Sequence, residues 1–139
     1  MVKKVFHYFY NRNPSNHFNP FNYFNFFNQI PTQMLSQDLF IHHVYFWLSN
    51  PDSKEDHAAL QAGLQALSKV PSIQQFHIGV PANTNRDVID TSYQFSWLAI
   101  FPTKEAQDAY QVDPIHLHFV DTCKHLWSAV KVLDSVGAY

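Results

Sequence analysis

The chain has 139 residues, the length of one ordinary domain, and a formal net charge of only −2. Its eleven carboxylates all fall in residues 34–139 and outnumber the Lys and Arg there, which excludes the basic face that nucleic-acid binding needs. No run approaches the ~20 apolar residues of a membrane span. The single cysteine, Cys123, excludes an internal disulfide and favours a reducing compartment, so we expect a cytoplasmic protein.

Residues 1–36 are predicted to be a low-complexity extension, with the folded domain at 37–139. Residues 1–33 hold seven Asn and ten Phe or Tyr but no carboxylate, and the run 16–28 follows neither the helical nor the strand period. Three interpretations compete: a signal peptide, a disordered interaction arm with aromatic anchors, and upstream sequence translated ahead of a natural start at Met34. Polar residues interrupt the apolar stretch that a signal peptide needs. We favour the third interpretation, since Lys, Asn, Phe, Tyr and Ile all have A/T-rich codons, as expected of non-coding DNA that is read through.

The domain opens with an apolar segment at 39–48, which predicts a β-strand covered on one face by helices and on the other by a second sheet. Capping residues then precede a helix over 52–69, where leucines recur on one narrow stripe. A strand with one polar face follows at 76–80, and a loop rich in Pro, Asn and Asp runs from 81 to about 92. Alternating apolar residues predict a third strand over 93–101.

Two helices are predicted next, the first of them a short helix that Thr103 caps. Asp113 and Pro114 start the second, because a carboxylate accepts hydrogen bonds from the free amides and a proline lacks only an N–H that would be unsatisfied there. Apolar residues at helical spacing extend this helix to Trp127 and place His116 on the same inward stripe as Trp127. Alternating valines beyond it predict a fourth strand.

The order β-α-β-β-α-β predicts an α+β, ferredoxin-like fold, in which a four-stranded antiparallel sheet carries helices on one face. The other face of the sheet is then expected to expose an apolar patch large enough to require a partner. Its expected members are Phe40, Val44, Phe46, Leu98 and Ile100. Two such sheets packed face to face would bury both patches in a symmetric dimeric α/β barrel. We therefore expect a homodimer through the sheet face.

Several segments resemble the stress-responsive dimeric A/B barrel family, often called Dabb. They are the histidine-containing strand at 41–48, residues 71–73 after the first helix, the strand at 93–101, and the Pro-x-His element within 113–119 together with Trp127. The resemblance covers about residues 39–136. It implies the dimeric barrel fold but no single activity, since many members have no assigned reaction.

One plant branch of the family, similar to olivetolic acid cyclase, folds a linear polyketide into an aromatic acid with a tyrosine–histidine pair. The resemblance places that histidine at His116 and the tyrosine at Tyr110. It places a first-strand histidine at His43 and a pocket-lining tryptophan at Trp127. The chain departs from the branch at Asp113, where a histidine is usual. Bulky rings also replace smaller aliphatic residues and are expected to narrow the cavity, at Tyr45, Trp47 and Trp97.

Tyr110 and His116 are the candidate catalytic residues. An imidazole with a pKa near ~6.5 accepts a proton at neutral pH, and a phenol stays protonated and donates a hydrogen bond to a carbonyl or enolate oxygen. Such a pair suits proton abstraction beside a carbonyl, as in aldol-type closure or isomerisation. The alternative is a structural hydrogen bond that holds the short helix in place.

A ligand pocket between sheet and helices is expected to be lined by His43, Tyr45, Trp47, Trp97 and Trp127. His43 shares the parity of Tyr45 and Trp47, so it approaches His116 if that face looks toward the helices. The alternative is a core histidine that is bonded to the backbone or to a neighbouring strand. His42 then points toward the dimer interface and is interpreted as structural.

No cofactor is expected, because the three glycines lie far apart and form no phosphate-binding loop. The pocket rings also leave little room for a haem macrocycle. His118, Asp121 and His125 share one helix face at metal-ligand spacing, but this face lies opposite the apolar one and is interpreted as exposed, without a metal site. Cys123 is interpreted as a packing residue.

These patterns favour a homodimer that binds a small apolar or aromatic ligand in its pocket, with no established reaction. Two alternatives remain open. One is a cofactor-free cyclase, lyase or isomerase that uses Tyr110 and His116, and the other is a protein that only assembles through its sheet face. A cavity that holds both side chains is compatible with the binder and the enzyme, whereas a filled cavity leaves assembly alone.

Overall fold

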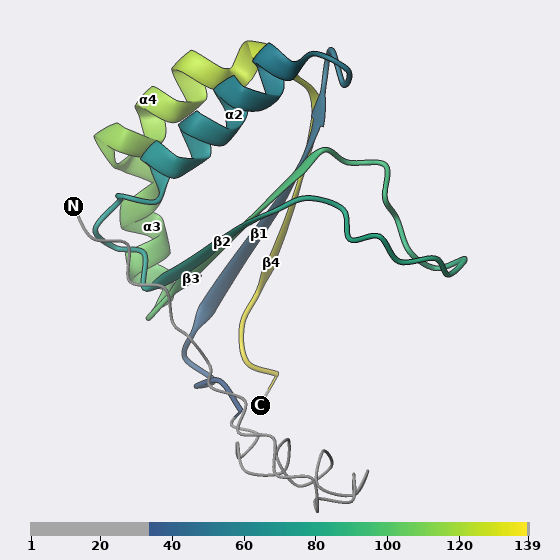
Figure 1. The fold of residues 1–139 in the computed structure, drawn as a ribbon. Coiled ribbons are helices and arrows are strands. Elements are labelled where there is room, and N and C mark those ends of the chain that lie inside the picture. Colours follow the sequence, from purple (N-terminus) through teal and green to yellow (C-terminus); the bar gives the residue numbers. More distant parts are fainter. Residues whose placement is uncertain (1–33, 139) are drawn as a thin grey trace, which may run out of the picture. The chain divides into compact units, whose positions relative to one another are not determined.

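A sheet and a layer of helices make up the computed structural model, which describes residues 34–138 (Figure 1). The elements follow the order β1 (Phe40–Leu48), α2 (Lys54–Leu67), β2 (Gln75–Gly79), β3 (Phe95–Phe101), α3 (Lys104–Val112), α4 (Pro114–Cys123), a 3-10 turn η1 (Lys124–Leu126) and β4 (Trp127–Ser135). The strands pair antiparallel in the order β2-β3-β1-β4, and the helices lie on one face. This is the predicted α+β, ferredoxin-like fold. The predictions for residues 1–33 lie outside the described residues.

Helices α2, α3 and α4 each begin at a side-chain cap. The Ser53 hydroxyl accepts a hydrogen bond from the backbone N–H of Asp56 at 3.1 Å, and Thr103 caps α3 in the same way. The Asp113 carboxylate accepts from the N–H of Ile115 at 2.8 Å, and proline occupies the first turn of α4. The predicted helix starts at Thr103 and Asp113 are therefore confirmed.

The end of the last helix was predicted wrongly, because α4 stops at Cys123 and Trp127 is the first residue of β4. The 3-10 turn reverses the chain between them, and Trp127 pairs with Leu48 of β1 across an irregular register. Leu126 and Trp127 are apolar and suit either a helix face or the start of an alternating strand, so spacing alone extends the helix too far. Trp127 still packs under α4, where its ring lies 5.8 Å from the ring of Phe119.

The structure also corrects which face of β1 looks toward the helices. The three members of the expected outward patch that lie on this strand are instead buried beneath the helices, and they are Phe40, Val44 and Phe46. The opposite parity carries the part-buried residues Ile41, His43, Tyr45 and Trp47. Both parities of β1 are apolar or aromatic, so alternation does not identify the inner face. Pairing with β3 does, because Val44 lies opposite Trp97 while His43 lies opposite Leu98.

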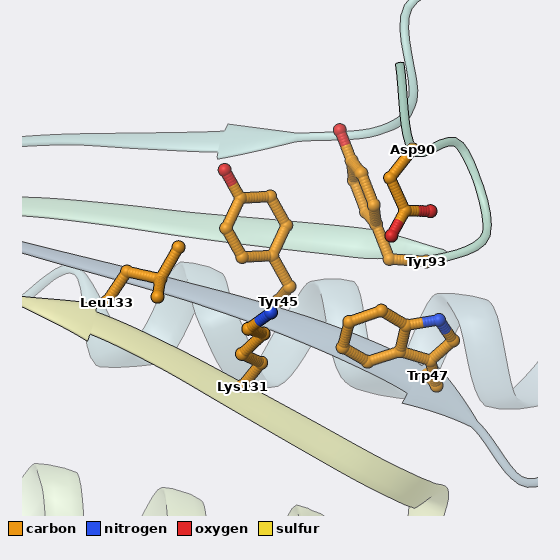
Figure 2. A pocket seen from close by; sticks show the side chains of 6 residues that line it. All are labelled: Tyr45, Trp47, Asp90, Tyr93, Lys131 and Leu133. Atoms are coloured by element: carbon orange, nitrogen blue, oxygen red, sulfur yellow. The ribbon is translucent and has the colours of Figure 1, made fainter. Parts of the chain in front are cut away.

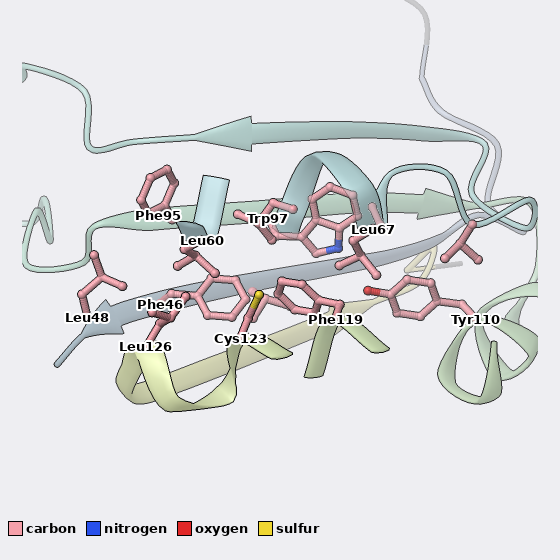
Figure 3. Packing of buried hydrophobic residues seen from close by; sticks show 14 of the residues in the cluster. Phe46, Leu48, Leu60, Leu67, Phe95, Trp97, Tyr110, Phe119, Cys123 and Leu126 are labelled. Carbon is pink, nitrogen blue, oxygen red and sulfur yellow. The ribbon is translucent and has the colours of Figure 1, made fainter. Parts of the chain in front are cut away.

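The core lies between the inner face of the sheet and the helices (Figure 3). Three leucines of α2 are fully buried in it at Leu60, Leu64 and Leu67. From α4, Phe119 and Cys123 face the same core. Within residues 34–138 no helix covers the outer face of the sheet, whose side chains are Ile41, His43, Tyr45, Trp47, Leu98, the buried Ile100, Lys131 and Leu133. We call this surface the outer face.

We expect Gly63→Ala to destabilise the fold, although alanine is the better helix former. A Cβ at position 63 would lie 2.6 Å from the Cys123 sulfur and 3.2 Å from the Phe119 ring, because α2 and α4 meet there. Overpacking of this kind costs about 1–3 kcal/mol of unfolding free energy, to be measured by urea denaturation. The double variant Gly63→Ala/Cys123→Ala removes the sulfur and should recover part of that loss. A Gly63→Ala protein as stable as the original would contradict the close approach.

Candidate functional site

A cavity of about 320 Å³ lies between the inner face of the sheet and helices α2, α3 and α4, and we call it the helix-side cavity. Strands β1, β3 and β4 form its floor. The polar side chains that line it are His42, Tyr110, Gln111, His116 and Asp134. Its apolar walls are Val44, Phe46, Leu67, Trp97, Phe119, Val120, Trp127, Val130 and Val132. No lining residue is Lys or Arg.

The two candidate catalytic residues meet in this cavity. Tyr110 lies near the end of α3 and His116 in the first turn of α4, and the corner at Asp113 brings their rings to a centroid distance of 4.5 Å. Tyr110 is only 1% exposed, whereas His116 is half-buried. The prediction that these two side chains share one hollow therefore agrees with their positions, and their chemical role stays a prediction.

The hydrogen bond of His116 determines which of its nitrogens is free. Its Nδ1 lies 3.2 Å from the backbone oxygen of Gln111, and a carbonyl oxygen only accepts, so Nδ1 carries the hydrogen. The lone pair is then on Nε2. Burial lowers the pKa of His116, and His42 adds to the effect, while the Gln111 carbonyl and Asp113 oppose it. The imidazole is therefore neutral at pH 7 and able to accept a proton at Nε2.

Tyr110 has the opposite property. Burial raises the pKa of its hydroxyl well above the usual value of 10, so the phenol stays protonated and remains a hydrogen-bond donor at every physiological pH. The Trp97 indole N–H lies close enough to oppose this rise in part. It does not, however, form a hydrogen bond of ordinary geometry with the hydroxyl.

Trp97 itself holds an unsatisfied donor. It is 1% exposed, and its Nε1 is one of two buried side-chain polar atoms in residues 34–138 without a hydrogen-bond partner. Figure 3 shows this nitrogen turned toward the Tyr110 hydroxyl across the core. A buried donor left unpaired costs about 1–3 kcal/mol of folding free energy. A hydrogen-bond acceptor bound in the cavity could therefore pair with this N–H.

His42 is a site residue that the sequence prediction assigned to the wrong face. It is buried on the inner face, and its Nδ1 donates to the Asp134 carboxylate of β4 at 2.6 Å. Its ring lies 5.7 Å from that of Tyr110. The carboxylate fixes the ring so that Nε2 is its free nitrogen. Strand alternation would have found this pair only once β1 was placed the right way round, because His42 and Asp134 face each other across β1 and β4.

The outer face has a separate cavity of about 300 Å³ (Figure 2). It is lined by Tyr45, Trp47, Asp90, Tyr93, Lys131 and Leu133. The predicted pocket is therefore divided: Trp97 and Trp127 line the helix-side cavity, whereas Tyr45 and Trp47 line this one. The Tyr45 and Trp47 rings lie on the outer face and cannot narrow the helix-side cavity. Of the three bulky rings that replace smaller residues of the plant branch, only Trp97 occupies space there.

His43 lines neither cavity and does not approach His116, since the two lie on opposite faces of the sheet. Its Nδ1 lies 3.1 Å from the Tyr45 hydroxyl, and the two rings pack at 4.3 Å. Burial lowers the pKa of His43, and the neighbouring His77 and His42 lower it further. The alternative interpretation, a core histidine bonded to the backbone or to a neighbouring strand, does not describe it either, because His43 is only part-buried and its partner Tyr45 lies on the same strand.

The profile of the stress responsive A/B barrel domain matches residues 41–136 of the chain. The chain belongs to this Dabb family. A Dabb family protein from Mesorhizobium loti with a ferredoxin-like fold is 20% identical at a TM-score of 0.61, with 73% of this chain and 98% of that chain covered. The predicted resemblance is therefore confirmed. No curated protein sequence matches the chain significantly.

Other structures share the fold at lower identity. A dimeric ferredoxin-like protein of unknown function from Thermobifida fusca is 15% identical at a TM-score of 0.58, with 75% of this chain and 96% of that chain covered. The hydroxynitrile lyase from Passiflora edulis is 14% identical at 0.60, with 73% and 94% covered. These likenesses concern the fold of this Dabb domain, not its activity.

Residues 34–138 show neither a cluster of metal ligands nor a membrane-spanning helix. No three His, Cys, Asp or Glu side chains in that range are arranged to hold a metal ion. His118, Asp121 and His125 are each exposed. Within the same range, no helix has the length and apolar character to cross a bilayer.

We expect the folded state to lose stability as the pH falls below about 6.5. The pKa values of His116 and His43 are lower in the folded protein than the ordinary 6.5, so the unfolded chain binds protons first as the pH drops. The stabilisation is complete above pH 6.5 and is lost as the pH falls toward the lowered values. The urea midpoint should therefore be lower at pH 5.5 than at pH 7.5, and His116→Gln should lessen the difference. His118→Gln, an exposed position on the same helix, should leave it unchanged, and equal behaviour of the two variants would contradict the burial argument.

Proposed function

We propose that this Dabb protein binds a small, mostly apolar or aromatic molecule in the helix-side cavity. The observation that carries the proposal is the cavity itself: about 320 Å³ with apolar walls and a few converging polar groups. Small-molecule sites generally have this make-up. A cavity of this size suits a compact molecule rather than a macrocycle, and it matches the expectation of a small ligand.

Blocking the cavity tests this proposal. Val132 lines the mouth on β4 and is 48% exposed, so Val132→Trp adds a large ring there at little cost in stability. Acetophenone is a suitable compact aromatic probe, and its binding can be followed by NMR titration. Its affinity should fall at least about tenfold in Val132→Trp. Leu117→Trp, an exposed change on α4 outside the cavity, is the matched control, and equal affinity in both variants would refute the location.

The hydrogen bond of His116 favours a second candidate function, a cofactor-free enzyme that removes a proton beside a carbonyl. Nε2 of His116 would accept the proton, and the Tyr110 hydroxyl would donate a hydrogen bond to the oxygen on which negative charge develops. The support for these roles is the neutral imidazole with a free Nε2 in ring contact with a phenol that stays protonated. The hydroxynitrile lyase from Passiflora edulis shows that this fold is compatible with small-molecule chemistry.

Exchange of the acetophenone methyl protons in D₂O measures this reaction directly. If the enzyme proposal is right, the protein accelerates exchange over buffer, and His116→Ala removes the acceleration while binding stays within a few fold. Tyr110→Phe should slow exchange by about 10²-fold, the usual effect of deleting one donor to a developing oxyanion. Exchange no faster than in buffer would refute the enzyme proposal and would leave the ligand-binding proposal unaffected.

We also propose that the protein is a homodimer through the outer face. Apart from the buried Ile100, the aromatic and aliphatic side chains of this face are part-buried or exposed within one chain, and Leu133 is 50% exposed. Apolar surface of this extent usually marks an interface. Related structures from Thermobifida fusca and Bacteroides fragilis are described as dimeric.

The domain boundary and the location of the protein remain proposals. We propose that residues 37–139 fold and assemble without residues 1–36, which is supported by the family match at 41–136. After deletion of residues 1–33, the far-UV circular dichroism spectrum should still be that of a folded α+β domain, and the sedimentation coefficient should still correspond to a dimer. Loss of folding would refute the proposal. The lone cysteine supports a cytoplasmic location, which subcellular fractionation would test.

A further inference from the structure

The buried indole N–H of Trp97 makes no hydrogen bond of ordinary geometry within residues 34–138, although the Tyr110 hydroxyl lies near it. Buried polar groups in folded proteins are paired in the great majority of cases, so an unpaired one needs an explanation. Trp97 lies in the middle of β3, where it is paired with Val44, and its ring stacks on Phe76 at a centroid distance of 5.7 Å. The ring is therefore held in place, and its donor direction is fixed by packing rather than by a partner.

A second donor lies beside it. Trp97 and Tyr110 both line the helix-side cavity, and the indole nitrogen and the phenol oxygen turn toward each other (Figure 3). The Tyr110 ring is itself fixed between Phe101 and His116, at 5.1 and 4.5 Å. Two rigid donors on one side of a cavity can hold a single oxygen atom that has two lone pairs.

We propose that Trp97 Nε1 and Tyr110 Oη form a two-donor site for the oxygen of a neutral carbonyl compound. The inference deepens the small-ligand function and rests on it. A carboxylate is disfavoured, because no Lys or Arg lines the cavity and Asp134 already does. A carbonyl oxygen only accepts hydrogen bonds, and an acceptor is what the two donors lack.

Three probes of similar size separate this inference from simple hydrophobic binding: acetophenone, cumene, in which a methyl group replaces the oxygen, and benzoate. Acetophenone should bind at least about fivefold more tightly than cumene, the usual worth of one net hydrogen bond, and benzoate should bind more weakly than acetophenone. Trp97→Phe removes the N–H and keeps an aromatic ring. It should reduce the preference for acetophenone severalfold, because only the Tyr110 hydroxyl then remains to donate, while the affinity for cumene changes less than about twofold.

Trp127→Phe is the matched control, because Trp127 lines the same cavity but its nitrogen is not an unpaired buried atom. It should keep the preference for acetophenone. In the ¹⁵N–¹H spectrum of the unmodified protein, the Trp97 indole signal, assigned by its nuclear Overhauser contacts with the stacked Phe76 ring, should move downfield with acetophenone and not with cumene. This second measurement applies even if the variant folds poorly.

The outcomes distinguish the inference from the function on which it rests. Equal affinities for acetophenone and cumene, with an unmoved Trp97 signal, would overturn the two-donor site and leave the small-ligand pocket intact. Tighter binding of benzoate would overturn the choice of a neutral carbonyl. Failure of all three probes to bind would overturn both proposals together.

Discussion

Leu133→Glu is expected to convert the protein from a dimer into a monomer. Leu133 lies on the outer face opposite His43 and is 50% exposed in one chain, so the single chain tolerates a carboxylate there. In a symmetric sheet-on-sheet dimer, the same substitution buries a carboxylate from each protomer. Desolvation of an unpaired charge costs several kcal/mol, which predicts at least a hundredfold rise in the dimer dissociation constant.

Sedimentation velocity at micromolar concentration measures this effect. The unmodified protein should have twice the chain mass and Leu133→Glu one chain mass. Leu117→Glu is the matched control, since Leu117 is equally exposed at 54% but lies on α4, away from the outer face. An unmodified monomer, or a Leu133→Glu protein that stays dimeric, would refute an interface at this face.

The proposed dimer would also decide which cavity is open to a ligand. The cavity beside Tyr45 and Tyr93 lies on the outer face, so a second copy of the chain would cover it. The helix-side cavity lies on the opposite face of the sheet and would stay accessible. For this reason the proposed ligand site and the proposed interface do not compete for one surface.

The second large effect is an asymmetry between Asp134 and His42. Asp134→Leu should cost about 1–3 kcal/mol of unfolding free energy, because it leaves the buried imidazole without its partner. His42→Leu should cost less, because a leucine suits the buried position and water can solvate the Asp134 carboxylate, whose side chain is 42% exposed. The pair is therefore expected to contribute to the unfolding free energy mainly by satisfying the buried imidazole of His42.

Urea denaturation of the two variants at pH 7.5 checks this asymmetry. Asp108→Leu is a useful control, because Asp108 pairs with Lys104 on the surface of α3, where ion pairs contribute little. Its unfolding midpoint should stay close to that of the unmodified protein. A larger loss for His42→Leu than for Asp134→Leu would contradict the arrangement.

Much of the fold could be predicted because local signals agree with it. Thr103 and Asp113 are capping residues followed by amphipathic helices, and each helix starts where its cap is. The same corner at Asp113 brings Tyr110 and His116 together, so their proximity depends on only a few residues of chain. Short-range chemistry of this kind is readable from spacing.

The rest of the site depends on long-range pairing that spacing does not reveal. The inner face of β1 is decided by its register with β3 and β4, since both of its parities are apolar or aromatic. That one ambiguity placed His43 in the pocket and His42 outside it. It also hid the contact between His42 and Asp134, which are 92 positions apart.

A crystal structure of the protein grown with acetophenone would show whether the helix-side cavity is the ligand site. The ketone is expected between the sheet and α4, with its oxygen near Trp97 Nε1 and the Tyr110 hydroxyl. A ketone found only on the outer face between Tyr45 and Tyr93, or a helix-side cavity left without ketone at saturating concentration, would contradict this expectation.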